Sequence, residues 1–272
     1  MNHRKPAVFV GAVLVLIVFG AVAFVFITRN DSSNVITRTV GRGSSGDPNT
    51  LAIYAPSELS KPLERVTTAF QQEHPGTTFQ FTLGPSSELS KRIQDGQKPS
   101  IYIDAAAGVA LVSAKARPTA APVAFGNDIV QLAVTKGNPR QVDGLGAFGS
   151  GSPLNSGICS PQLFCGRAAA EVLQHAGVNA APKVVTNNIG DLTDGVARGR
   201  IDAVLLMRSD LRSVLTSIST LATPPQASYR VDYQMAQYQT GGSTDQFIQW
   251  LQGSPNARHV LRFAGMLSFY DV

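Results

Sequence analysis

The feature that most constrains the fold is a regular alternation of short apolar segments and amphipathic ones, which begins at residue 51. Three apolar runs of strand length come first: LAIYA (51–55), TTFQFTL (77–83) and SIYIDAAA (100–107). A helix is predicted from Ser57 to about His74, because four apolar residues there share one helical face: Leu59, Leu63, Val66 and Phe70. Strands that alternate with helices in this way predict an α/β fold with a parallel sheet.

The alternation continues through a second unit after the Pro- and Ala-rich stretch ARPTAAP. Further strands are predicted at NDIVQLAVTKGNP (127–139), SGICS (156–160), PKVVT (182–186), IDAVLLM (201–207) and YRVDYQMAQYQ (229–239). Further helices are predicted from Ser86 or Ser87, at 166–178, at 188–200, and as two short helices split by Pro255. Two α/β units and a tail predict two lobes: 50–123 with 239–272, and 124–238 including two crossing strands.

The composition suits a folded domain without a nucleic-acid partner. With 43% hydrophobic and 15% charged residues, the 272-residue chain can bury a large core. The net charge is +5, but Arg4 and Lys5 belong to the N-terminal segment and the other basic residues are scattered without aromatic residues between them. The remaining excess of positive charge is too small to indicate nucleic-acid binding.

The N-terminus has the pattern of a membrane segment. Basic residues precede about 22 residues without charge, Ala7 to Thr28, which is long enough to cross a bilayer. We expect residues 1–28 to be an uncleaved anchor; a cleaved signal peptide is the alternative, although its Ala-Val-Ala site at 21–23 lies inside the apolar run. Polar residues 29–49 predict a flexible linker. The expected location is the cell membrane, with a single-pass anchor and an extracytoplasmic domain.

Two cysteines, Cys159 and Cys165, lie close together in GICSPQLFCGR. They either close a small disulfide loop, which would place the domain in an oxidising compartment, or remain two buried thiols. A metal site is not expected, because no C-x-x-C spacing and no nearby histidine complete a ligand set.

An enzyme is not expected either. The segment GLGAFG (144–149) spells a dinucleotide-binding pattern, but it runs into SGSP rather than a helix and is predicted to be a loop. The three histidines of the later chain, His74, His175 and His259, are far apart, and no Ser/His/Asp or paired-carboxylate pattern is present. We therefore expect no catalytic residues and no cofactor.

Several ordered stretches carry a family resemblance. They are YAPSEL (54–59), FQQEHPG (70–76), GPSSEL (84–89), QDGQKPSIYIDAA (94–106), LAVTKGNP (132–139), CGRAAAEVLQHAGV (165–178), GDLTDGVARGRIDAVLLMRSD (190–210) and FIQWLQGSPNARHVLRFAGM (247–266). Over about 50–268 the chain resembles the molybdate-binding proteins of ABC importers, within the type II periplasmic-binding-protein fold. The resemblance implies capture of molybdate or tungstate between two lobes, and delivery to an ABC permease and its ATPase.

The resemblance also implies ligand contacts, at Ser57, Ser86 or its neighbour Ser87, Cys165, Ile189 and Met207. Helix N-termini and serine hydroxyls supply the N–H and O–H donors that a dianion needs. N-capping of its own helix is the alternative role for each serine.

Two of these positions depart from the family pattern. At the position of Cys165 the family has a small residue, and it is the backbone N–H that matters there. At the position of Met207 the family commonly has a tyrosine, whose hydroxyl donates a hydrogen bond; the thioether of methionine cannot do so. The alternative function is therefore a membrane-anchored envelope protein with a degenerate pocket, acting as a sensor or interaction module.

Overall fold

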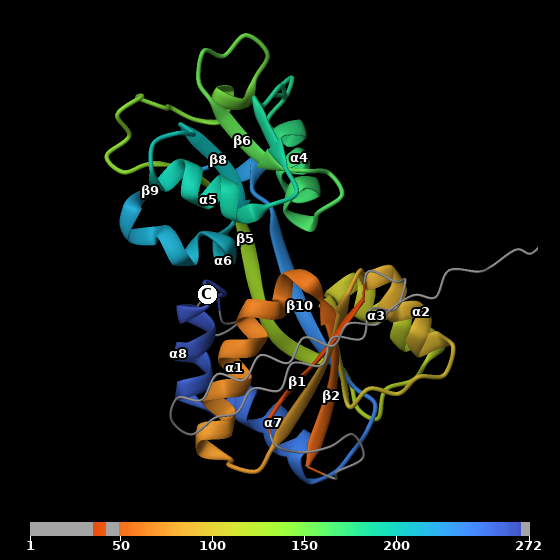
Figure 1. Ribbon diagram of the computed structural model, residues 1–272. Helices are drawn as coiled ribbons and strands as arrows, with labels where there is room; N and C mark the ends of the chain where they lie inside the picture. The colour runs from red at the N-terminus through yellow and green to blue at the C-terminus, as the bar shows by residue number, and fades with distance from the viewer. Residues whose placement is uncertain (1–34, 42–48, 268–272) are drawn as a thin grey trace, which may run out of the picture.

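The computed structural model describes residues 35–41 and 49–267, which form two lobes (Figure 1). Two strands, β5 (Val123–Thr135) and β10 (Arg230–Gln237), run between them. The two-lobed α/β fold predicted from the alternation is confirmed. The predicted anchor, residues 1–28, lies outside the described residues; within those residues, no helix combines the length and the apolar character needed to span a bilayer.

Lobe one contains the N-terminal strands and the last two helices. Its strands are β1 (Ile36–Val40), β2 (Thr50–Pro56), β3 (Thr78–Gly84) and β4 (Ile101–Ala105). Its helices are η1 (Ser57–Leu59), α1 (Ser60–Glu73), α2 (Ser86–Gln94), α3 (Ala106–Lys115), α7 (Gly242–Gly253) and α8 (Pro255–Phe263). The strand order is β1-β3-β2-β4-β10-β5, with β2 parallel to both β3 and β4.

Lobe two repeats the arrangement around a smaller sheet. Its strands are β6 (Ser156–Cys159), β7 (Val184–Thr186), β8 (Ala203–Met207) and β9 (Ile218–Leu221). Its helices are η2 (Leu145–Phe148), α4 (Phe164–His175), α5 (Ile189–Ala197), α6 (Arg208–Leu211), η3 (Arg212–Ser217) and η4 (Pro225–Ala227). Strands β8, β6 and β7 are parallel, and β5 pairs antiparallel with β8 and β9.

Strand β5 belongs to both sheets. Residues 123–129 pair with β10, whereas residues 130–135 pair with β8 and β9. Strand β10 in turn pairs with β4 of lobe one. The lobes are thus connected through continuous hydrogen-bonded strands, and the C-terminal ends of their parallel strands meet where the lobes face each other (Figure 1).

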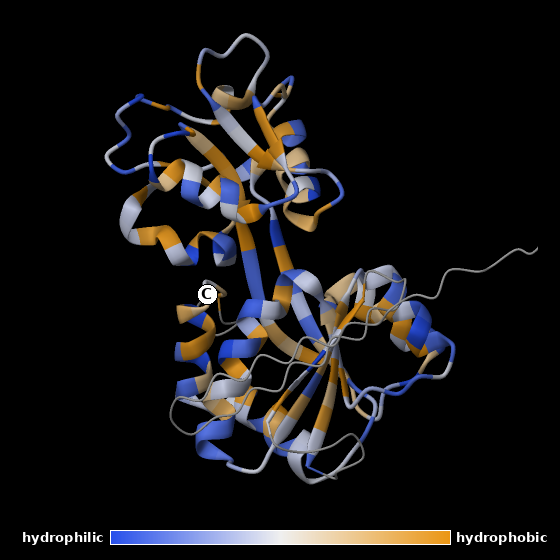
Figure 2. Ribbon diagram, in the orientation of Figure 1, coloured by the Kyte–Doolittle hydropathy of each residue, from blue (hydrophilic) through white to orange (hydrophobic). Residues whose placement is uncertain are grey.

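The core of lobe one is built on the predicted helical face of α1. Leu63, Val66 and Phe70 are at most 1% exposed and pack onto the sheet. The Phe70 ring contacts Phe79 and Phe247 edge-on, with ring centroids 6.0 and 5.1 Å away. Figure 2 shows hydrophobic residues along much of both sheets and hydrophilic residues on parts of the helix surfaces.

Two segments differ from the sequence-based expectation. Residues 36–40, predicted to belong to the flexible linker 29–49, instead form β1, antiparallel to β3. The segment is rich in β-branched residues and covers the open edge of β3, while Val35 and Val40 are buried at its two ends. The segment 144–149, predicted to be a loop, contains the 3₁₀ turn η2 and leads to a strand, not to the helix of a dinucleotide site.

Candidate functional site

The three predicted serines of lobe one lie at helix starts. Ser57 follows β2 and begins η1, and Ser86 and Ser87 follow β3 and begin α2. In both cases the N-cap residue is a proline, Pro56 or Pro85, and no side chain caps the helix. The alternative role predicted for the serines, N-capping their own helices, is therefore not what the structure has. Ser57 and Ser87 are exposed and Ser86 is partly buried.

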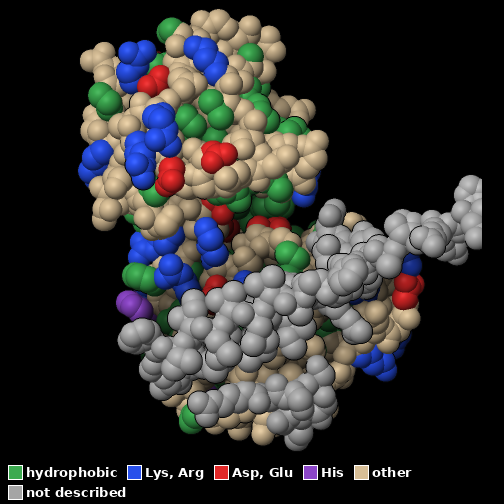
Figure 3. All heavy atoms as spheres, viewed as in Figure 1, with side chains coloured by type: hydrophobic (Ala, Val, Ile, Leu, Met, Phe, Trp, Pro, Cys, Tyr) green, Lys and Arg blue, Asp and Glu red, His purple; other side chains and the backbone are tan. Residues whose placement is uncertain are grey.

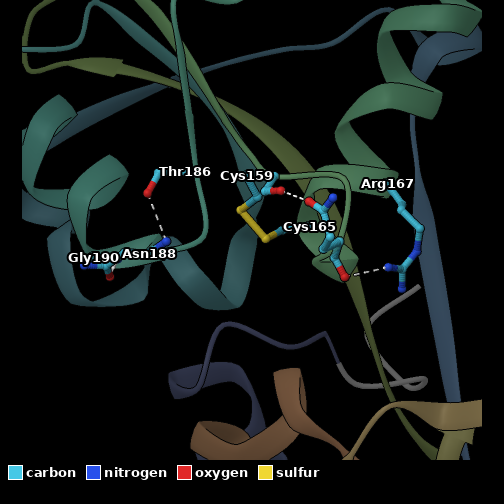
Figure 4. Close-up of a disulfide and its surroundings, with 8 residues drawn as sticks. Cys159, Cys165, Arg167, Thr186, Asn188 and Gly190 are labelled. Atoms are coloured by element: carbon cyan, nitrogen blue, oxygen red, sulfur yellow. Dashed lines mark hydrogen bonds between the residues drawn. A yellow bond between two sulfur atoms is a disulfide. The ribbon is translucent and has the colours of Figure 1, made fainter. Parts of the chain in front are cut away.

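The predicted contacts of lobe two also lie at or next to helix starts, and Figure 4 shows one of them, Cys165, at the beginning of its helix. Cys165 is in the first turn of α4, Ile189 begins α5, and Met207 is the last residue of β8 before α6. The start of α5 is capped by Asn188, whose Oδ1 accepts a hydrogen bond of 3.0 Å from the Gly190 N–H. One of the α5 donors is therefore engaged within the protein.

A disulfide joins Cys159 to Cys165 at the start of α4, with the two Cα atoms 5.8 Å apart. Both cysteines are at most 4% exposed. The loop between them folds back onto the helix, because a Cβ atom on Gly166 would lie 2.1 Å from the Ser160 carbonyl oxygen. The disulfide loop therefore fixes the position of Cys165 and its backbone N–H. The family resemblance implies a backbone donor at this residue.

Charged side chains gather where the lobes meet (Figure 3). The pKa of Glu58 is raised to about 7, chiefly by burial and also by the Asp104 and Asp210 carboxylates, while a backbone hydrogen bond and Arg167 oppose the rise. Asp210 and Arg167 belong to lobe two, so Glu58 interacts across the gap between the lobes. Burial likewise raises the pKa of Asp210 to about 6, against the attraction of Lys61. Sequence reasoning had considered none of these residues.

Asp104 accepts hydrogen bonds from three donors of lobe one. Its side chain is at the end of β4, 4% exposed, and its Oδ1 accepts hydrogen bonds from the Ser86 hydroxyl at 2.9 Å and the Ala105 N–H at 2.8 Å. Its Oδ2 accepts from the Tyr102 hydroxyl. The carboxylate lies against the first turn of α3, where a Cβ on Gly108 would come within 2.6 Å of Oδ2. Burial raises the pKa of Asp104, although its hydrogen bonds oppose that shift.

A second buried carboxylate, Asp128, lies in the part of β5 that pairs with β10. It is 4% exposed, and its Oδ1 accepts from the Ile129 N–H at 2.8 Å and the Ser209 N–H at 3.4 Å. Its pKa is raised to about 7, chiefly by burial and to a smaller extent by Asp210, while its hydrogen bonds to Ser209 and Ile129 oppose the rise. An internal carboxylate therefore engages the start of α6, beside the predicted contact Met207, which is 2% exposed.

A phenol lies among these carboxylates. Tyr233 of β10 is 2% exposed, and burial raises its pKa, with further contributions from Glu58, Asp128 and Asp104. The signal that could have identified Asp104, Asp128 and Tyr233 is their position within or at the end of otherwise apolar strands, where a polar group requires partners.

No metal centre is formed by the described part of the chain, which contains no group of three or more His, Cys, Asp and Glu side chains arranged for an ion. Two surface hollows lie elsewhere, one between α1 and α8 and one beside Ser100 and Gln239 at the opposite end of the sheet. Neither hollow is lined by a predicted ligand residue.

Comparisons with known proteins agree with this fold. Residues 51–267 match the family model described as bacterial extracellular solute-binding protein. The molybdate-binding protein ModA of Mycobacterium tuberculosis is 24% identical over 186 residues, which are 68% of this chain and 71% of that protein. A Clostridium difficile protein assigned as the substrate-binding domain of a molybdenum ABC transporter has a TM-score of 0.64 at 15% identity, covering 80% of this chain and 98% of its own. The periplasmic molybdate-binding protein of Azotobacter vinelandii gives 0.61 at 18%, covering 80% and 99%.

Proposed function

Because the chain belongs to the bacterial extracellular solute-binding proteins, we propose that it captures a tetrahedral oxyanion between its two lobes. Molybdate and tungstate are the first candidates, since the similar curated protein is named a molybdate-binding protein. The observation that supports the proposal is the place of four predicted contacts in the fold: Ser57, Ser86, Cys165 and Ile189 each lie in the first turn of a helix that follows a strand. Helix N-termini and hydroxyls bind anions without requiring a counter-cation.

The proposed role is transport. The protein would deliver its anion to an ABC permease and the ATPase that drives it, with no catalytic step of its own. Residues 7–28 would anchor the chain in the membrane and leave the lobes on the extracytoplasmic side, where a disulfide between Cys159 and Cys165 persists.

The test is a thermal shift of the protein with molybdate, tungstate, sulfate and phosphate. A ligand present at a hundredfold excess over its Kd stabilises a protein by about 2.7 kcal/mol, which is measurable as a higher Tm. Replacing both Ser57 and Ser86 by alanine should abolish the shift. The matched control is Ser90→Ala, one turn further along α2, whose hydroxyl donates to the Ser87 carbonyl and should not matter. No shift with any of the four anions would refute the proposal.

A second candidate is an envelope protein that has this fold but a degenerate pocket, and acts as a sensor or interaction module. Two observations favour it: Met207 offers a thioether where the family commonly has a hydroxyl donor, and the Ser86 hydroxyl already donates to Asp104. Such a protein would show no oxyanion-dependent shift in the wild type.

A further inference from the structure

A noncovalent contact joins the two lobes at the C-terminal end of α8, apart from the strands β5 and β10 (Figure 1). Phe263 is the last residue of α8 in lobe one, and Arg212 is the first residue of η3 in lobe two. The Arg212 guanidinium lies over the Phe263 ring, 4.5 Å from its centroid, and its Nε donates a hydrogen bond to the Phe263 carbonyl oxygen. One side chain of lobe two therefore contacts both the ring and the backbone of this residue.

Two further contacts follow along residues 265–267. Gly265 fits closely against the start of α6, because a Cβ atom there would lie 2.7 Å from the Ser209 Cα. Leu267 forms an isolated bridge with Asn127 of β5, with backbone hydrogen bonds of 2.8 and 3.0 Å. The segment after α8 thus packs on lobe two and then pairs with a strand that connects the lobes.

These contacts act on a helix that begins beside a predicted ligand contact. Met207 immediately precedes α6, and Ser209 in the first turn of α6 donates its N–H to Asp128. The corresponding predicted contacts of lobe one, Ser57 and Ser86, begin η1 and α2. Because α8 belongs to lobe one, its contact with η3 and α6 fixes how these two sets of residues are placed relative to each other.

The contact between Arg212 and Phe263 is strong enough to bias the lobe arrangement and weak enough to break. Phe263 is half exposed and Arg212 partly exposed, so water can reach both groups when they separate. Separation therefore leaves no buried, unpaired charge. A cation over an exposed ring, together with one hydrogen bond, changes an equilibrium constant by roughly threefold to thirtyfold.

We infer that Arg212 is a positioning residue for anion capture: through Phe263 it favours the lobe arrangement in which residues of both lobes can contact one ligand. The effect on affinity rests on the proposed function, that the gap binds a tetrahedral oxyanion, whereas the effect on the lobe arrangement does not. The apparent affinity for a ligand falls with the fraction of molecules in the binding-competent arrangement. Arg212 thus acts through α8 and is not itself a ligand contact.

The structure offers a matched pair of substitutions on the same ring. Arg65 of α1 also lies over Phe263, 5.0 Å from the ring centroid, but α1 and α8 both belong to lobe one. Arg65→Ala removes a cation from the ring without removing a contact between the lobes. Arg212→Ala removes the contact that joins them. Both side chains are accessible to water, so we expect both variants to fold.

Spin labels on His259→Cys in α8 and Thr216→Cys in η3 measure the separation of the lobes by pulsed EPR. Both positions are exposed, and the two native cysteines are joined in a disulfide and take up no label. Without ligand, Arg212→Ala should give a longer and broader distance distribution than the wild type, and Arg65→Ala should give the wild-type distribution. In calorimetric titrations of the unlabelled protein, Arg212→Ala should bind molybdate roughly threefold to thirtyfold more weakly, and Arg65→Ala as tightly as the wild type.

The outcomes separate this inference from the proposed function. An unchanged distance distribution in Arg212→Ala would overturn the inference, and so would an equal change in Arg65→Ala, because packing within lobe one would then be the cause. A longer distance with unchanged molybdate affinity would overturn the positioning role. If the wild type binds no oxyanion while Arg212→Ala still lengthens the distance, the proposed function fails and the control of the lobe arrangement by Arg212 is supported.

Discussion

Replacing Asp128 by asparagine should change how stability depends on pH. The pKa of Asp128 is raised from 3.8 to about 7 in the folded protein, first by burial. Between these two values the native state holds a proton that the unfolded state has released. The free energy of unfolding should therefore fall as the pH rises through this window and stay level above it. Three pKa units at 1.36 kcal/mol each correspond to about 4 kcal/mol for a group so little exposed.

Asparagine at 128 is neutral at every pH, and its Oδ1 can still accept from the Ile129 and Ser209 N–H groups. The variant should therefore become more stable than the wild type as the pH rises from 4 to 8, with the difference growing by up to about 4 kcal/mol. Glu58 and Asp210, whose pKa values are also raised, titrate in both proteins and largely cancel from the difference, although Asp210 is coupled to Asp128.

Urea denaturation at unit intervals of pH, followed through the fluorescence of the single tryptophan, measures this difference. The matched control is Asp95→Asn, an exposed carboxylate paired with Lys91, whose substitution should leave the pH profile unchanged. If the profiles of wild type and Asp128→Asn stay parallel, Asp128 titrates normally and our account of its burial is wrong.

Three further tests concern the disulfide and the packing. Replacing Cys159 and Cys165 by serine should lower the free energy of unfolding by about 2 kcal/mol, the effect of a short closed loop, and urea denaturation of reduced wild type should match. Phe70→Ala should cost about 3–5 kcal/mol in the same assay, as this ring is fully buried. Gly265→Ala, at φ +89° with backbone atoms 2.7 Å from the added Cβ, should lower Tm more than Gly76→Ala, at φ +107° with open space around it; equal shifts would contradict the packing between α8 and α6.

Elements with a clear local pattern could be predicted from the sequence. The helix α1 has apolar residues on one face, the strands β2 and β8 are almost entirely apolar, and β3 alternates apolar and polar residues. Helix α3 was missed, because its ten residues are small or apolar almost all round: Val109 and Val112 are buried while Leu111 is 71% exposed. Strand β1 was missed for another reason, since it depends on pairing with β3, about 40 residues away in the sequence.

The positions of the predicted ligand residues follow from the strand and helix boundaries in the sequence. Their hydrogen-bond partners do not follow from these boundaries. Ser86 begins the helix after β3, and Asp104 ends β4, with β2 between the two strands in the sheet. Nothing in the local sequence indicates that their side chains meet at 2.9 Å. The same holds for Asp128 and Ser209, which are 81 residues apart. The sequence spacing of strands and helices could identify hydrogen-bond donors at helix starts. Only the folded structure shows that carboxylates already accept hydrogen bonds from these donors.

These hydrogen bonds between the donors and internal carboxylates change the free-energy cost of binding an anion at the site. In an anion site built from free N–H and O–H groups, the ligand replaces water and little else. Here a dianion would meet two buried carboxylates, Asp104 of β4 and Asp128 of the connecting strand β5, each already accepting hydrogen bonds from the donors beside it. Binding a dianion then requires these carboxylates to take up protons, which their raised pKa values make less costly. Anion affinity should therefore decrease as the pH rises from 6 to 8, unless the ligand brings the proton itself.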